Sequence, residues 1–257
     1  MSIIFTQDQL ASLRQRDGKP RGLPESVSNE LRIKGSLQVA LQGSDSALVE
    51  SAYQDVRNFF ALDARVKDKF QRVSMNGRIV SYSTREPDID GVREALDIMS
   101  LRQKTGGVVT SKALENIWKA DRSPLMAVRN IMGKIVQDIL YGIETYLPDG
   151  YASIEQYDAR LGDKMRGLFY QKGGRMESHT DNDLLTVLHA RQTGVSVNYE
   201  EKAVNQDVFT VIVGKQLEQI SEDFFWATAH EVNATCERQS LAYFYGISKE
   251  VARPKVA

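Results

Sequence analysis

Three side chains in the second half of the sequence have the types and the spacing to hold one metal ion. His179 lies two residues before Asp181 in the run SHTDNDLLTVL, and His230 follows the aromatic run DFFWATA. In an extended segment the side chains of residues i and i+2 point to the same face, so His179 and Asp181 can converge on one ion. Two imidazoles and one carboxylate leave other metal positions open, which suits iron(II) and oxygen chemistry.

A second polar pair follows at the same spacing. Arg238 and Ser240 lie in the run ERQSLAYFYG, and a guanidinium beside a hydroxyl forms a fork for a carboxylate. A continuous strand would separate Arg238 from His230 by about 26 Å, which is too far for one small acid to bridge. We therefore expect the chain to turn at Asn233–Thr235 and to fold back as a hairpin. Arg238 and Ser240 would then lie within a dicarboxylate's length of the metal.

Two other reactive side chains give weaker signals. His189 lies inside LLTVLHAR with no ligand type at a suitable spacing, so we expect a structural residue. Cys236 is the single cysteine; it cannot form an internal disulfide, which fits a reducing compartment. We expect it to be a small packed residue rather than a metal ligand.

The composition indicates a globular protein and disfavours several partners. Of 257 residues, 42% are hydrophobic and 26% are charged, which is typical of a soluble chain with a sizeable core. A net charge of −1 without a long basic run is unsuited to a phosphate backbone, so we expect no nucleic-acid partner. No stretch approaches the roughly 18 apolar residues of a membrane span, and the N-terminus is unlike a secretory signal. We expect a cytoplasmic protein with no membrane association and a small-molecule substrate; the sequence does not indicate its oligomeric state.

The pattern of apolar residues changes near residue 150. Before it, helical spacing dominates, most clearly over 44–60 and 124–147. After residue 160 the segments become short, β-branched and aromatic, as an antiparallel sandwich or barrel requires. The expected strands are 184–190, 194–200, 207–214 and 239–246.

These patterns predict one domain over residues 1–257. Its mostly helical part, about 1–150, and its β core, about 151–250, would share one apolar core, because no obvious linker separates them.

Residues 165–246 resemble the isopenicillin N synthase-like, or plant-type, 2-oxoglutarate/iron(II)-dependent dioxygenases. The runs MRGLFY, SHTDNDLLTVLHARQTGVSV, VFTVIVGKQLEQIS and AHEVNATCERQSLAYF follow that family's order, and a weaker likeness extends the match to about residues 30–246. The resemblance implies a mainly β fold with flanking helices, built on a double-stranded β-helix (jelly-roll) core. It also implies a catalytic Fe(II) bound by His179, Asp181 and His230.

The resemblance assigns the carboxylate fork to the co-substrate. Arg238 and Ser240 would bind the C5 carboxylate of 2-oxoglutarate, and Tyr170 matches a tyrosine that helps to hold this co-substrate in relatives. Three positions depart from the family pattern: Gln171 replaces the usual proline after that tyrosine, Leu168 replaces a nearby asparagine, and Lys215 replaces an aspartate.

The implied activity is O2-dependent oxidation of an unactivated C–H bond in a small biosynthetic metabolite, such as an amino acid or peptide. The outcome would be hydroxylation, desaturation, cyclisation or epimerisation. The segment SMNGRIVSYSTREPDIDGVREALDI lies where the family places substrate contacts. Tyr82 and Arg85 are the substrate-binding candidates there, Arg85 because an arginine in a pocket pairs with a substrate carboxylate.

Two alternatives stay open. The first is an iron oxidase of the isopenicillin N synthase type that uses no 2-oxoglutarate, in which Arg238 and Ser240 bind the substrate's own carboxylate. The second is a jelly-roll binding protein without enzymatic activity.

Overall fold

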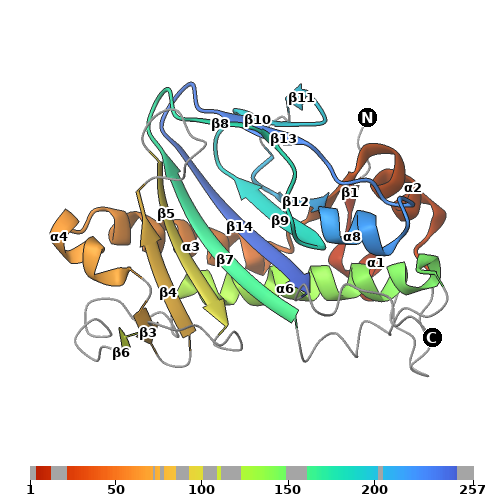
Figure 1. Cartoon of the computed structure of the whole chain (residues 1–257), viewed down its shortest axis with the longest axis horizontal. Helices are drawn as coiled ribbons and strands as arrows, with labels where there is room; N and C mark the ends of the chain where they lie inside the picture. The colour runs from red at the N-terminus through yellow and green to blue at the C-terminus, as the bar shows by residue number, and fades with distance from the viewer. Residues whose placement is uncertain are drawn as a thin grey trace.

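Two facing β-sheets and a layer of helices make up the part of the chain that is described. The computed structural model describes residues 4–12, 22–71, 73–75, 78–84, 93–100, 109–110, 123–148, 161–201 and 205–247. The helices lie against one face of the larger sheet, and the smaller sheet lies over its other face (Figure 1). None of the described helices is long and apolar enough to cross a membrane.

The larger sheet has ten strands, antiparallel except at its two ends, where β1 pairs with β2 and β3 with β6 in parallel. In pairing order they are β1 (Ile4–Phe5), β2 (Ser36–Ala40), β12 (Val208–Val213), β9 (Leu185–Ala190), β14 (Arg238–Ile247), β7 (Leu161–Tyr170), β5 (Arg93–Ser100), β4 (Arg78–Ser83), β3 (Val73–Met75) and β6 (Val109–Thr110).

The smaller sheet has four antiparallel strands and closes the sandwich. In pairing order they are β11 (Glu200–Glu201), β10 (Val195–Val197), β13 (His230–Asn233) and β8 (Arg175–His179). A cluster of buried side chains from both sheets, including Tyr170 and Leu168 on one side and Val197 and Val232 on the other, fills the space between them. The polar site described below lies in this space.

The two long helices cover the far face of the larger sheet (Figure 1). The helices are α1 (Gln7–Ala11), α2 (Glu25–Lys34), α3 (Gly43–Phe60), α4 (Ala64–Lys67), α6 (Pro124–Ile143) and α8 (Lys215–Ile220), with 3-10 turns η1 (Asp68–Phe70) and η3 (Glu144–Tyr146). Helix α6 begins where Ser123 Oγ accepts a hydrogen bond from the backbone N–H of Leu125, with Pro124 in the first turn.

Strand alternation sends successive side chains of the central strands to opposite faces. Along β14, Leu241, Tyr243 and Tyr245 belong to the large apolar core that includes α3 and α6. On β7 the helix-facing position between two core residues is Gly167, where a Cβ would lie 2.8 Å from Val56 Cγ2 of α3. Glycine therefore lets this helix approach the sheet closely.

Several sequence-based expectations are confirmed. The predicted mainly β architecture with flanking helices is present, and the helices expected over 44–60 and 124–147 are α3 and α6 with η3. The expected strands differ from β9, β10, β12 and β14 by a few residues at their ends. The part of the chain before residue 150 also contributes strands, among them β2, β4 and β5, which the helical patterns did not indicate.

The predicted hairpin between His230 and Arg238 is wrong. Strand β13 pairs with β8 and β10 in the smaller sheet, whereas β14 pairs with β7 and β9 in the larger one. The chain does turn after Asn233, but it passes from one sheet to the other. Each strand forms its backbone hydrogen bonds with strands that are more distant in the sequence, and β13 and β14 do not pair with each other. The two strands therefore face each other across the sandwich.

Candidate metal centre

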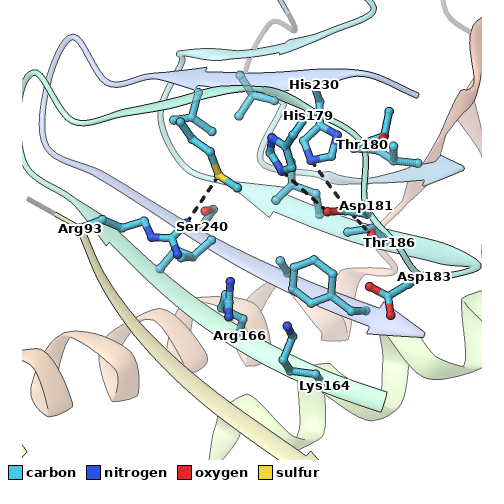
Figure 2. A pocket seen from close by; sticks show the side chains of 18 of the residues that line it. Arg93, Lys164, Arg166, His179, Thr180, Asp181, Asp183, Thr186, His230 and Ser240 are labelled. Carbon is cyan, nitrogen blue, oxygen red and sulfur yellow. Dashed lines mark hydrogen bonds and ion pairs between the residues drawn. The ribbon is translucent and has the colours of Figure 1, made fainter. Parts of the chain in front are cut away.

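His179, Asp181 and His230 meet at one edge of the smaller sheet. His179 ends β8 and pairs directly with His230 at the start of β13, with ring centroids 4.3 Å apart. Asp181 lies in the loop after β8; its carboxylate oxygens are 3.7 Å from His179 Nε2 and 3.6 Å from His230 Nε2. One ligand atom from each residue lies within 4.8 Å of the others, and Figure 2 shows the three groups converging.

Backbone carbonyls orient the imidazole rings of both histidines. His179 Nδ1 lies 2.9 Å from the carbonyl oxygen of Glu177, and His230 Nδ1 lies 3.2 Å from that of Thr228. A carbonyl can only accept, so Nδ1 carries the proton in each ring and Nε2 presents its lone pair to the shared centre. Burial lowers the pKa of His230, although the Asp181 carboxylate opposes this shift. The neutral imidazole that a metal requires is therefore favoured.

Hydrogen bonds anchor both the side chain and the backbone of Asp181. Thr186 Oγ1 on β9 donates a hydrogen bond of 2.5 Å to Asp181 Oδ2, and the backbone N–H of Lys215 donates to the Asp181 carbonyl oxygen at 2.8 Å. Such supporting contacts orient a ligating carboxylate. Thr186 was not predicted to be part of the site. Its place near the start of the strand that follows His179 and Asp181 could have indicated this role.

Arg238 is buried with part of its hydrogen-bonding capacity unused. The residue is 1% exposed, and its Nη1 donates to Ser240 Oγ at 3.2 Å. Its Nε and Nη2 have no hydrogen-bond partner among the described residues. Burial lowers the pKa of this guanidinium, because a charge away from water is unfavourable. A bound carboxylate would supply both the missing acceptors and the missing counter-charge.

A row of three residues across adjacent strands forms the end of the site around Arg238. Tyr170 on β7 pairs with Arg238 on one side and with Arg93 of β5 on the other. The Tyr170 ring centroid lies 5.6 Å from the Arg238 guanidinium carbon and 5.9 Å from that of Arg93. Tyr170 Oη and Arg93 Nη1 both donate to Met176 Sδ, at 3.6 and 3.5 Å. Arg93 was not predicted from the sequence. The alternation of polar and apolar residues over 93–100 could have indicated the strand that carries it.

A cavity of about 340 Å³ between the sheets joins these groups. It is lined by the three metal candidates and by Arg238, Ser240 and Tyr170, so the structure brings together all six residues predicted for the metal and the co-substrate. This volume lies in the range of small-molecule sites.

The two substrate-contact candidates are not placed in this cavity. Tyr82 is buried in the core on the helix side of β4, 5.8 Å from the Phe59 ring centroid, and its hydroxyl donates to Glu94. It is not among the lining residues. Arg85 lies outside the described residues.

The expectation for His189 is confirmed, and the expectation for Cys236 is wrong. His189 is buried in the core with its Nδ1 2.8 Å from the Tyr53 hydroxyl, as a structural residue should be. Cys236 is exposed, so the expectation of a packed cysteine is wrong. It lies in the turn by which the chain crosses between the sheets.

Comparison with known proteins identifies the class. Residues 156–247 match the sequence model of the 2OG-Fe(II) oxygenase superfamily. The dioxygenase for auxin oxidation 1 of Arabidopsis thaliana, solved with 2-oxoglutarate, is 15% identical with a TM-score of 0.69, and the match covers 97% of this chain and 94% of that one. The rice dioxygenase for auxin oxidation is 18% identical, with a TM-score of 0.67 and coverages of 97% and 84%. A full-length Neurospora crassa protein, solved with alpha-KG and 5-formyluracil, is 15% identical, with a TM-score of 0.68 and coverages of 96% and 85%. No curated protein sequence matches the chain.

The fold is the predicted double-stranded β-helix core with flanking helices, and its cavity holds a set of groups that could bind one metal ion. Residues 156–247, which carry the three metal candidates and the carboxylate fork, match the 2OG-Fe(II) oxygenase superfamily, whose members use Fe(II), 2-oxoglutarate and O2. The structures compared above share the fold of this chain. The chain is accordingly a dioxygenase, an oxidoreductase. Its own residues fit these groups, because two imidazoles and a carboxylate are a donor set for Fe(II) and the buried Arg238 lacks acceptors.

Proposed function

We propose that the chain oxidises an unactivated C–H bond of a small biosynthetic metabolite, within the isopenicillin N synthase-like branch of its superfamily. His179, Asp181 and His230 would hold Fe(II), and Arg238 with Ser240 would hold the C5 carboxylate of 2-oxoglutarate. The observation that carries the proposal is the buried Arg238, whose Nε and Nη2 lack partners among the described residues in the same cavity as the metal candidates.

Each group has a distinct task in this scheme. When bound, iron(II) and 2-oxoglutarate supply the oxidant from O2. The imidazoles bind through Nε2 because their Nδ1 protons are committed to backbone carbonyls. Thr186 keeps the Asp181 carboxylate turned toward the centre. Arg238 and Ser240 grip and orient the co-substrate, and the apolar side chains between the sheets exclude water from it.

The size of the cavity supports a small-molecule substrate. About 340 Å³ has to accommodate the co-substrate and the group to be oxidised, which leaves no room for a folded macromolecule. Structural relatives were solved with small ligands, such as 5-formyluracil in the Neurospora crassa protein. Hydroxylation, desaturation, cyclisation and epimerisation all use the same set of metal and co-substrate residues, so the outcome depends on where the substrate's C–H bond lies.

The test combines a spectrum with a product assay. We expect Fe(II) and 2-oxoglutarate, mixed anaerobically with the protein, to give the weak visible charge-transfer band of the chelate, and oxygen then to release succinate. Asp181→Ala removes one metal ligand and should lose both signals, by at least about 100-fold in succinate rate. Cys236→Ser, on the exposed turn, is the control and should retain both.

The same experiment decides between the alternatives. A wild-type protein that binds iron but gives neither the band nor succinate would favour an oxidase in which Arg238 and Ser240 bind the substrate's carboxylate. Failure to bind any divalent metal would instead support a binding protein without enzymatic activity.

A further inference from the structure

The three most exposed large apolar side chains among the described residues lie close together on the surface. Ile33 on α2 is 73% exposed, Tyr199 after β10 is 82% exposed, and Trp226 before β13 is 62% exposed. Ile33 and Trp226 line one pocket of about 390 Å³, together with Asn198, which directly precedes Tyr199. We call the surface formed by Ile33, Tyr199 and Trp226 the apolar patch. Exposed apolar patches of several hundred Å² are uncommon on monomeric proteins and mark interaction sites.

Hydrogen bonds fix the three segments that form the apolar patch. Asn198 Nδ2 donates to the carbonyl oxygen of Lys34 at 2.6 Å, which joins the β10–β11 hairpin to the end of α2. The backbone N–H of Asn198 donates to the carbonyl oxygen of Ala229 at 2.9 Å. Thr228 Oγ1 donates to the carbonyl oxygen of Gly35 at 2.5 Å. The patch is therefore preorganised, and a partner could bind without first ordering these segments.

The turn between β10 and β11 exposes an aromatic ring at an unfavourable backbone conformation. Asn198 and Tyr199 are the two turn residues, with φ values of 51° and 62°. Turns with positive φ at both positions favour asparagine followed by glycine, because a bulky side chain is crowded by the backbone there. Glycine would suit position 199 better, yet the chain carries a tyrosine and exposes it to water. Strained backbone of this kind is found where a side chain has a binding role.

A projection and a hollow lie side by side in the apolar patch. Tyr199 projects from the tip of a hairpin at the rim of the molecule (Figure 1), and the adjoining pocket lies between Ile33 and Trp226. An interface with two-fold symmetry needs a surface that is complementary to itself. Two copies of this chain meet that requirement, because the Tyr199 ring of each copy can enter the pocket of the other.

The area of the apolar patch is sufficient for a small dimer interface. Burying an aromatic side chain removes about 150–250 Å² from water, so the three apolar side chains offer roughly 400–600 Å² in each copy. A symmetric dimer would bury about 1,000 Å² from these residues alone, which is close to the lower limit for a specific interface.

The charges around the apolar patch also suit a second copy. Arg32 lines the pocket, with its guanidinium carbon 5.3 Å from the Phe224 ring centroid, and it is exposed. Glu200 follows Tyr199 on the hairpin and is also exposed. Insertion of the hairpin into the pocket of another copy would therefore bring opposite charges together at the edge of the contact.

We propose that the apolar patch is a homodimer interface, in which Tyr199 of each copy occupies the pocket between Ile33 and Trp226 of the other. Arg32 of one copy lies opposite Glu200 of its partner. The interface contains none of the metal or co-substrate candidates, so it does not depend on the proposed function. Thr228, which lines the pocket, accepts from His230 Nδ1 through its carbonyl oxygen, so the interface adjoins the metal centre.

The first test measures self-association of the full-length protein by sedimentation velocity. We expect the wild-type protein to dimerise with a Kd in the range of about 1–50 µM, as suits a small interface. Tyr199→Asn removes the ring but keeps a residue that tolerates the left-handed turn, so the dimer should weaken by at least about 10-fold. Tyr199→Phe keeps the ring and should retain the dimer. Leu48→Ala, at an exposed apolar position on α3 outside the pocket, is the control and should associate as wild type does.

A charge exchange tests the symmetry of the interface. Arg32→Glu and Glu200→Arg should each weaken the homodimer by about 10-fold, because like charges would then face each other. An equimolar mixture of these two variants should form a heterodimer with nearly wild-type affinity, because both contacts again pair opposite charges.

Three results would overturn the inference. They are a wild-type protein that stays monomeric up to about 100 µM, a Tyr199→Asn variant that dimerises as wild type does, and a charge-exchange mixture that associates no better than either variant alone. Thermal unfolding of each variant, measured on dilute monomer, confirms that it is folded. Tyr199→Asn should unfold at the wild-type temperature or above, because the turn is less strained. Association is measured without iron or 2-oxoglutarate, so failure of the proposed function would not affect the result.

Discussion

The two faces of the larger sheet bury opposite kinds of side chain, although the same strands supply both. On β14, Leu241, Tyr243 and Tyr245 pack against the helices, while Arg238 and Ser240, equally buried, face the cavity. Burying a leucine stabilises a fold by about 1.5–3 kcal/mol, whereas a buried polar group without a partner destabilises it. The helix face therefore stabilises the protein, and the cavity face holds groups whose unfavourable burial a ligand can offset.

The largest expected effect comes from removing a charge from the cavity face. Arg238→Met should weaken 2-oxoglutarate binding by about 30-fold or more, because truncating one partner of a buried charge pair costs about 2–5 kcal/mol. Without ligand, the variant should unfold at the same temperature as wild type or higher, since a buried charge with unused donors has gone. Calorimetry with 2-oxoglutarate and thermal unfolding measure the two quantities.

Arg191→Met is the matched control for that variant. Arg191 pairs with Glu50 away from the cavity, so losing its charge should leave 2-oxoglutarate affinity unchanged. If both variants lose the same affinity for 2-oxoglutarate, the overall charge of the protein rather than the Arg238–Ser240 fork determines binding. The proposed difference between the two faces of the sheet would then be wrong.

A change on the helix face should have the reverse pattern. Leu241→Ala should lower the free energy of unfolding by about 2–5 kcal/mol, because Leu241 is fully buried beneath the helices. The affinity of the folded protein for 2-oxoglutarate should remain within about twofold of wild type, since the side chain points away from the cavity. Urea unfolding and calorimetry below the unfolding transition provide the measurements; a stable Leu241→Ala variant that has lost 2-oxoglutarate binding would contradict the assignment of faces.

The smallest expected effect concerns the buried His189 and pH. Burial lowers the pKa of His189 in the folded state, and its two ring nitrogens contact the Tyr53 hydroxyl and the Gln206 carbonyl oxygen. Below pH 6.5 the unfolded chain binds a proton that the folded chain resists, so this residue's contribution to stability should fall as the pH falls.

The corresponding variant isolates that contribution. His189→Gln should show a shallower loss of stability than wild type between about pH 6.5 and 5, measured by urea unfolding at each pH. Identical slopes for the two proteins would show that His189 has no linkage to pH, and that the acid sensitivity comes from other groups.

Much of the site was predictable because its residues lie in short, regular spacings. Arg238 and Ser240 lie at the start of β14, where alternation places both side chains on one face, and Asp181 follows the last residue of β8, His179, by only two positions. The long apolar stripes of α3 and α6 are equally local. In each case the spacing of nearby residues determines which side chains share a face, so this arrangement can be recognised from the sequence alone.

The errors concern pairings between distant segments. The turn after Asn233 was expected from its spacing, but whether the next strand returns to β13 or crosses to β7 depends on which strand edges are available in the folded chain. Arg93 reaches the cavity only because β5 pairs with β7, far along the chain. Tyr82, although near Arg93 in sequence, lies in the core on the helix side.

The position of Asp181 has a consequence for protein engineering. Both histidines belong to the paired strands β8 and β13, whereas Asp181 lies in a loop anchored through its backbone carbonyl to the N–H of Lys215. That anchor does not involve the side chain, so a smaller residue at position 181 leaves the ladder and the loop hydrogen bond intact. Of the three metal candidates, the carboxylate is thus the one that can be exchanged, to open a position for a different anion, with the least disturbance to the scaffold.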